Sequence, residues 1–263
     1  MTSPDLLRRV QARFLRELFR AGRSGFALKG GMALAALYPS ARLTQDIDLD
    51  FPPLGTRTAE SLHNQVRKAL EIALRGSAIK DVKIHEPGRA EVSPKWKVAG
   101  HAPDGAPFHL KIEVSRRPPP PGRVRQVPLA GVASLGLGTF FVDLYDAPTL
   151  GAMKIAALLS PVRHAPRDVF DLDLLLPAHQ PTPEGLQWAL DHAGLTPEGA
   201  SEMVKEKLAA MPWDLFATQV RPSLDPEVAT RFDAEAWQAM RNRVATAVTE
   251  LLAAQAERAG GAP

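Results

Sequence analysis

The chain of 263 residues contains no cysteine. This absence excludes a disulfide scaffold, cysteine-ligated zinc, iron–sulfur clusters and a thiol nucleophile, and it fits a reducing cytosol. Long apolar runs are missing too, since none approaches the roughly 20 residues that cross a bilayer. The first twenty residues lack the layout of a signal peptide, because arginines are spread through their apolar positions. We therefore expect a cytoplasmic protein with no membrane partner.

Several catalytic signatures are also missing. The seven histidines are scattered, without the HExxH or paired spacing of a zinc site. There is no GxSxG motif, and the glycine pair is not followed by the GK[ST] of a P-loop. The formal charge is only +3, but a local excess of basic residues runs from Lys111 to Arg125. This basic stripe is compatible with a phosphate-rich partner.

The hydrophobic pattern changes character near Pro148. The expected elements before it are a helix at 3–20, a strand entering a glycine turn at 25–31, a helix ending near Pro39, strands at 45–51, 80–86, 95–100 and 108–116, and a helix at 58–74. The four prolines in 116–122 remove ladder donors, so that segment is a connection or a sheet edge. Helices follow through about Ala256, with a linker at 177–185. The pattern predicts an α/β (α+β) domain over 1–146 and a helical domain over 147–263.

Three aspartates alternate with apolar residues in the strand at 45–51. Asp46, Asp48 and Asp50 therefore project from one side, about 6.6–7 Å apart, a distance that divalent cations can bridge. Mg²⁺ prefers such hard oxygen ligands. Asp50, nearest the prolines that close the strand, is expected to be a solvated neighbour. The simpler alternative is that all three form the wet face of an edge strand.

A glycine pair, Gly30-Gly31, lies between a predicted strand and a predicted helix. Glycine lets backbone N–H groups approach an anion closely, and the positive end of the following helix would face a phosphate. Alone, such a pair is more often a tight turn. Here it is followed by 14 residues and then by the acidic strand, which makes the combination more specific.

This order of a strand, a glycine pair, a helix and a DxD strand resembles the polymerase-β-type nucleotidyltransferase superfamily. The segments GGMAL, RLTQDIDL and KIAALLSPVRHAPRDVFDLDLL (154–175) are similar to those of the AbiEii/AbiGii toxin-like nucleotidyltransferases. These proteins are the toxin half of two-gene toxin–antitoxin or phage-defence systems. The resemblance implies a polymerase-β-like mixed sheet with flanking helices and a mostly helical second half that completes the active-site cleft. It also implies Mg²⁺ or Mn²⁺ as cofactor and an NTP as substrate.

The resemblance assigns roles to residues of the first half. Gly30 and Gly31 would hold the triphosphate of the nucleotide, while Asp46 and Asp48 would be the catalytic, metal-binding pair. Glu113 falls in the second polar strand motif, where it is expected either to bind metal as a third carboxylate or to orient a neighbouring lysine.

The remaining implied residues are basic or lie on helices. Lys111 shares the motif of the second polar strand and would contact the nucleotide. Lys154 and Asp168 would be catalytic, and Arg167 and Asp171 would bind the nucleotide. Alternatives remain open, because a lysine on an apolar helix often only extends to solvent and an acid such as Asp168 is favoured at a helix start.

The function that the resemblance implies is transfer of a nucleoside monophosphate to an acceptor, first of all the 3′ end of tRNA, by a toxin with a cognate antitoxin. One alternative is another acceptor, either a protein side chain or a small molecule. A second is a nucleotide-binding module without turnover. The preferred base, the acceptor, the antitoxin and the oligomeric state do not follow from the sequence.

Overall fold

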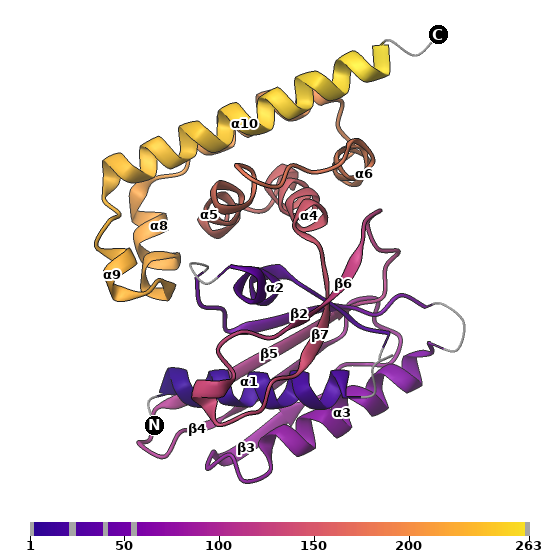
Figure 1. Ribbon diagram of the computed structural model, residues 1–263, viewed down its shortest axis with the longest axis vertical. Coiled ribbons are helices and arrows are strands. Elements are labelled where there is room, and N and C mark those ends of the chain that lie inside the picture. The colour runs from indigo at the N-terminus through magenta and orange to yellow at the C-terminus, as the bar shows by residue number, and fades with distance from the viewer. Residues whose placement is uncertain (1–2, 21–24, 39–41, 54–56, 261–263) are drawn as a thin grey trace. The chain divides into compact units, whose positions relative to one another are not determined.

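The computed structural model describes residues 3–20, 25–38, 42–53 and 57–260 (Figure 1). The chain divides into two compact units. The first unit consists of Met1–Pro39, Thr44–Pro119 and Val124–Tyr145, and the second of Ser40–Leu43, Pro120–Arg123 and Asp146–Pro263. The short segments 40–43 and 120–123 thus belong to the second unit, whereas the sequence pattern suggested one boundary between residues 146 and 147.

The first unit is built on a seven-stranded mixed sheet with the order β3-β4-β5-β2-β1-β7-β6. Its strands are β1 (Ala27–Lys29), β2 (Asp46–Asp50), β3 (Lys80–His85), β4 (Lys95–His101), β5 (Pro107–Ser115), β6 (Val124–Pro128) and β7 (Phe141–Tyr145). β2 pairs with β5 and β1 pairs with β7 in parallel, and the other pairs are antiparallel. The predicted fold class, a mixed sheet with flanking helices followed by a helical half, is confirmed.

Three helices of the first unit are α1 (Ser3–Phe19), α2 (Gly30–Leu37) and α3 (Ala59–Leu74). α1 packs against both α3 and the sheet. The apolar residues of β4 and β5 are buried on the side where α3 lies, since His63 of α3 packs against Trp96 of β4 with tilted rings whose centroids are 4.9 Å apart. α2 ends at Leu37, and Pro39, where its end was expected, lies outside the described residues.

The second unit is helical. Its helices are α4 (Ala147–Leu159), α5 (Pro166–Leu175), α6 (Pro183–Ala193), α7 (Pro197–Ala209), α8 (Trp213–Gln219), α9 (Pro226–Ala229) and α10 (Ala234–Gly260). Several begin with a polar cap followed by proline, as at Thr182 and Thr196, a pattern that suits a helix start. The long α10 buries Trp237, Val244 and Leu252 in the core of this unit.

Two features of the chain differ from the sequence expectation. β6 was not predicted, because it is an edge strand with mostly exposed residues and no apolar alternation. The expected linker 177–185 is shorter, because Thr182 caps α6 and Pro183 begins it. Within the part of the chain that is described, no helix has the length and apolar character to cross a membrane.

Candidate active site

The glycine turn lies directly beside one of the predicted carboxylates. Gly30 begins α2 with a φ of 66°, a left-handed conformation that side chains with a Cβ rarely adopt. A Cβ at this position would also lie 2.4 Å from Oδ2 of Asp48. Glycine is therefore required both for the backbone angle and for the approach of the carboxylate. The first N–H groups of α2 have no partner within the helix, as an anion-binding turn needs.

Strand pairing brings Asp46, Asp48, Lys111 and Glu113 together and adds Lys29, which was not predicted as a site residue. In the parallel pair β2–β5, Asp46 is opposite Lys111 and Asp48 is opposite Glu113. In the antiparallel pair β1–β2, Lys29 is opposite Asp48. Residues opposite each other in neighbouring strands point to the same face of a sheet. These five residues, which we call the carboxylate cluster, therefore share one face.

The charges within the carboxylate cluster are unevenly balanced. Lys111 Nζ lies 2.9 Å from Asp46 Oδ2. Burial lowers the pKa of Lys111, but the hydrogen bond and charge of Asp46 outweigh it, so the pKa lies above its ordinary value. Burial raises the pKa of Asp48, and the negative charges of Asp46 and Glu113 raise it further. Asp48 is thus a carboxylate whose ionised form lacks sufficient positive charge nearby.

The donor set fits a divalent cation held by two carboxylates. Mg²⁺ is commonly bound by one or two carboxylates plus substrate phosphate, and Asp46 and Asp48 supply such a pair beside the glycine turn. Glu113 as third ligand is not preformed, because Lys95 Nζ lies 3.4 Å from its Oε2. Among the described residues, no three acidic or histidine side chains stand ready to hold one ion together.

Asp50 is not solvated, and that expectation was wrong. Its side chain is 4% exposed, with Lys29 Nζ 2.5 Å from Oδ1, and the Tyr145 hydroxyl donates to Oδ2 at 2.9 Å. Asp50 is buried because β2 is an inner strand of the sheet. Its partner Tyr145 lies on β7, which is far from β2 in the sequence. Burial and the Asp50 carboxylate raise the pKa of Tyr145 far above its ordinary value. Asp50 and Tyr145 together fix Lys29 immediately before the glycine pair.

Replacing Tyr145 by phenylalanine tests this buried bond. The Tyr145→Phe change leaves one oxygen of a buried carboxylate without its donor, which costs about 1–3 kcal/mol. We expect the free energy of unfolding, measured by urea titration, to fall by that amount. An unchanged value would show that the hydroxyl does not stabilise Asp50.

The helical residues predicted from the sequence form a second cluster, within the second unit. Lys154 on α4 is 7% exposed and lies between two carboxylates of α5, with its Nζ 2.9 Å from Asp168 Oδ1 and 2.6 Å from Asp171 Oδ2. Both aspartates are 1% exposed, and their spacing of three residues puts them on one helix face, as expected.

Two arginines that were not predicted complete this cluster. We call Lys154, Asp168, Asp171, Arg42 and Arg163 the ion-pair cluster. Arg42 donates to Asp171 through Nε at 3.2 Å and Nη2 at 3.1 Å. Arg163 donates to Asp168 through Nε at 2.6 Å and Nη2 at 3.1 Å. Arg167, the arginine that the resemblance singled out, is instead exposed on α5. Arg42 stands in the segment RLTQDIDL that carries the resemblance, so its position was visible although its role was not.

The ion-pair cluster makes the stability of the fold depend on pH in the acid range. Burial raises the pKa of Asp168, but Lys154 and Arg163 outweigh it and lower the pKa to about 2. A carboxylate with a lowered folded-state pKa stabilises the fold above its unfolded pKa of about 3.9, and this contribution disappears as pH falls through the folded value.

We therefore expect the free energy of unfolding to fall between pH about 4 and pH about 2. Urea titrations at pH 5, 4, 3 and 2, followed by tryptophan fluorescence, measure it. Asp168→Asn, which cannot ionise, should show a shallower decline over this window. Parallel curves for the two proteins would contradict the assignment.

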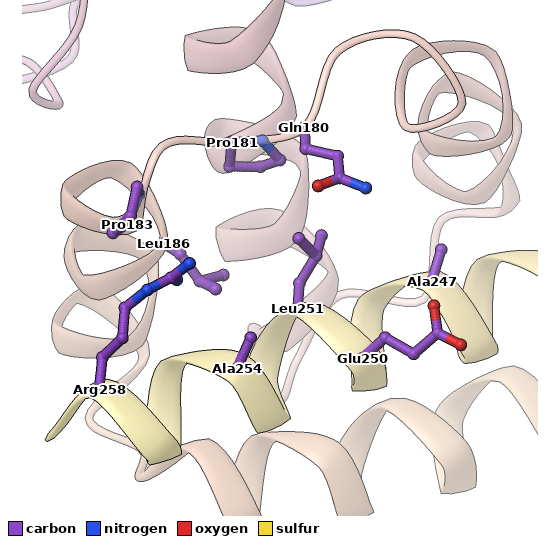
Figure 2. Close-up of a pocket in the computed structure, with 9 residues that line it drawn as sticks. All are labelled: Gln180, Pro181, Pro183, Leu186, Ala247, Glu250, Leu251, Ala254 and Arg258. Carbon is purple, nitrogen blue, oxygen red and sulfur yellow. The ribbon is translucent and has the colours of Figure 1, made fainter. Parts of the chain in front are cut away.

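A pocket of about 220 Å³ lies elsewhere in the second unit (Figure 2). It lies between the start of α6 and the face of α10, and contains none of the predicted site residues. Its lining residues are Gln180, Pro181, Pro183, Leu186, Ala247, Glu250, Leu251, Ala254 and Arg258. The pocket is smaller than common small-molecule sites, so the candidate chemistry stays with the two clusters.

Two solved structures align with nearly the full length of this chain. JHP933 from Helicobacter pylori aligns over 97% of this chain and 96% of its own, with 17% identity and a TM-score of 0.56. MenT4, the nucleotidyltransferase toxin Rv2826c from Mycobacterium tuberculosis H37Rv, aligns over 96% and 93%, with 16% identity and a TM-score of 0.51. At these identities the likeness shows a shared fold. No curated protein sequence matches the chain.

A family match extends over nearly the whole chain. The sequence profile of the nucleotidyl transferase AbiEii toxin, type IV toxin–antitoxin system, matches residues 13–257. This range includes the glycine turn, the carboxylate cluster and the ion-pair cluster. The chain therefore belongs to the AbiEii family of nucleotidyltransferase toxins of type IV toxin–antitoxin systems.

Proposed function

We propose that this protein transfers a nucleoside monophosphate from an NTP to the 3′ end of tRNA in the cytoplasm, with release of pyrophosphate. The observation that supports the proposal is the closeness of Gly30 to the Asp48 carboxylate, because it would bring a triphosphate bound at the glycine turn next to a metal ion bound at Asp48. Modification of the tRNA 3′ end would block aminoacylation and so inhibit translation and growth. The type IV system implies an antitoxin that counteracts it.

The residues of the first unit have complementary tasks in this reaction. The Gly30–Gly31 turn would bind the triphosphate through backbone N–H groups, and Lys29, fixed by Asp50, would add positive charge. Asp46 and Asp48 would hold Mg²⁺ or Mn²⁺. When bound, such ions activate the attacking oxygen and neutralise the charge of the departing pyrophosphate. Lys111, now paired with Asp46, would be free to turn to a phosphate when the carboxylate is occupied.

The roles proposed for the second unit are less direct. Lys154 has three donors and already places Nζ against two carboxylates. Lys154 and Asp168 remain candidates for catalysis, and Asp171 and Arg167 remain candidates for nucleotide binding. Because Lys154, Asp168 and Asp171 are buried and paired with one another, they also have a structural role.

A labelling screen tests the function. Purified protein is incubated with each α-labelled NTP and, in separate reactions, with tRNA, total protein or small hydroxyl compounds such as aminoglycosides. We expect label on tRNA, stoichiometric pyrophosphate, and loss of both with EDTA. Label on protein or on a small compound, and not on tRNA, would show that the acceptor is that molecule. Nucleotide binding without pyrophosphate would favour the non-catalytic module.

A further inference from the structure

One face of the sheet carries polar side chains beside the carboxylate cluster. On β4 and β5 the apolar residues alternate with polar ones, and the apolar set, including Trp96 and Phe108, is at most 2% exposed. α3 lies on that buried side, since its His63 contacts Trp96. The polar set on the other side is exposed or half-buried, so it forms a surface of the first unit.

The strand register arranges this surface in rows that lead to the carboxylate cluster. Lys97 on β4 is opposite His85 on β3 and opposite Lys111 on β5, and Lys111 is opposite Asp46 on β2. One row thus crosses four neighbouring strands, a distance of about 14 Å at three strand spacings. A second row holds Lys83 and His109 on either side of Ala99.

Carboxylates compensate only part of the positive charge on this surface: His101 Nδ1, for example, lies 3.7 Å from Asp81 Oδ2. Lys111 is paired with Asp46, and Lys95 with Glu113. Lys83 and Lys97 are exposed, and neither has an ion-pair partner within the described parts of the chain. Lys97 also lies directly opposite another lysine, an arrangement that destabilises a sheet. Unpaired like charges that the fold itself does not use are typical of a site for a polyanion.

The surface offers charge but little means of reading bases. Its outward residues on β3, β4 and β5 include no phenylalanine, tyrosine or tryptophan: they are Lys80, Lys83, His85, Lys95, Lys97, Ala99, His101, Pro107, His109, Lys111, Glu113 and Ser115. Proteins that recognise single-stranded bases stack them on aromatic rings, whereas lysines contact phosphates and carry no sequence information.

We propose that this lysine surface, centred on Lys83 and Lys97, binds the phosphate backbone of the acceptor RNA and guides its end towards Asp46 and Asp48. The inference rests on the proposed RNA acceptor and specifies where that acceptor binds. RNA is favoured over an acidic protein because the row of basic residues ends at the carboxylates where the acceptor hydroxyl must react. Binding through phosphates alone makes the affinity strongly dependent on salt and independent of sequence at this surface.

The test is a charge-reversal pair with a matched control. Lys83→Glu/Lys97→Glu changes the surface, and Lys68→Glu/Lys205→Glu makes the same change in net charge at exposed lysines on α3 and α7. Affinity for fluorescent tRNA is measured by anisotropy from 50 to 200 mM salt. We expect the surface pair to bind about tenfold more weakly, with a salt slope smaller by about 1.4, because about 0.7 counterions are released per phosphate contact. The control pair should stay within about twofold of wild type.

Separate readouts distinguish this inference from the proposed function. NTP binding and melting temperature should be unchanged in the surface pair, and Lys83→Gln/Lys97→Gln should show a smaller loss of the same kind. Equal loss of tRNA affinity in both charge-reversal variants, or no loss in either, would contradict the proposal that this surface binds RNA. If wild type still labelled tRNA, the proposed function would stand. Loss of antitoxin binding with tRNA binding intact would instead make this an antitoxin surface. Failure of wild type to bind or label tRNA would overturn both.

Discussion

Asp48→Asn is expected to abolish nucleotidyl transfer while making the protein more stable. Asparagine has nearly the shape of aspartate but cannot supply the charge that holds a divalent ion beside the glycine turn. Removal of a single preorganised charge-stabilising group commonly costs 10²–10³ in rate, and we expect a loss of about 10³-fold or more. Label transfer from an α-labelled NTP to tRNA measures it.

The gain in stability follows from the crowding of carboxylates. Burial, Asp46 and Glu113 raise the pKa of Asp48 in the folded protein. The folded state therefore binds a proton at Asp48 more tightly than the unfolded state, so ionisation of Asp48 opposes folding at neutral pH. A neutral asparagine removes this cost, and the free energy of unfolding at pH 7 should rise.

Two controls make the prediction specific. Asp104→Asn changes an exposed loop aspartate, which accepts a hydrogen bond from Ala106 N that asparagine can also accept, and should leave transfer and stability unchanged. Mg²⁺ with a non-hydrolysable NTP should raise the melting temperature of wild type but not of Asp48→Asn, because a ligand stabilises only the state that binds it. An active Asp48→Asn protein would show that Asp48 does not take part in the reaction.

Part of the arrangement of the carboxylate cluster follows from local sequence information. Alternation alone places Asp46 and Asp48 on one side of β2, and likewise sets Lys111 and Glu113 on one side of β5. That these two strands are parallel neighbours depends on distant segments, so the actual pairs of residues could not be derived. The error at Asp50 has the same origin, since its partner Tyr145 is 95 residues away.

The ion-pair cluster shows the same limit in the second unit. Helical spacing is sufficient to group Asp168 with Asp171, and the apolar character of α4 made Lys154 conspicuous. Arg42, however, is 129 residues from Asp171 in the chain. Arg163 lies in the loop before α5, where no periodicity indicates its direction. Contacts of this kind depend on tertiary packing, which the spacing of a single segment does not contain.

Lys154→Ala should strongly destabilise the second unit, whatever its effect on catalysis. The change removes a buried cation from two carboxylates that are each 1% exposed. Breaking a buried ion pair by deleting one partner costs about 3–5 kcal/mol. Because Arg42 and Arg163 remain, we expect a loss near the lower end of this range. Urea titration gives the value, and Lys205→Ala, at an exposed position on α7, should change it by less than about 0.5 kcal/mol.

A comparison of stability with activity then separates the structural from the catalytic role of Lys154. If the lysine only balances Asp168 and Asp171, transfer should fall in proportion to the unfolded fraction and should recover at lower temperature or with a stabilising osmolyte. If it also contacts the reacting nucleotide, the fully folded variant should remain at least about 10²-fold slower than wild type. A Lys154→Ala protein as stable as wild type would contradict the structural role and would mean that the two arginines alone neutralise Asp168 and Asp171.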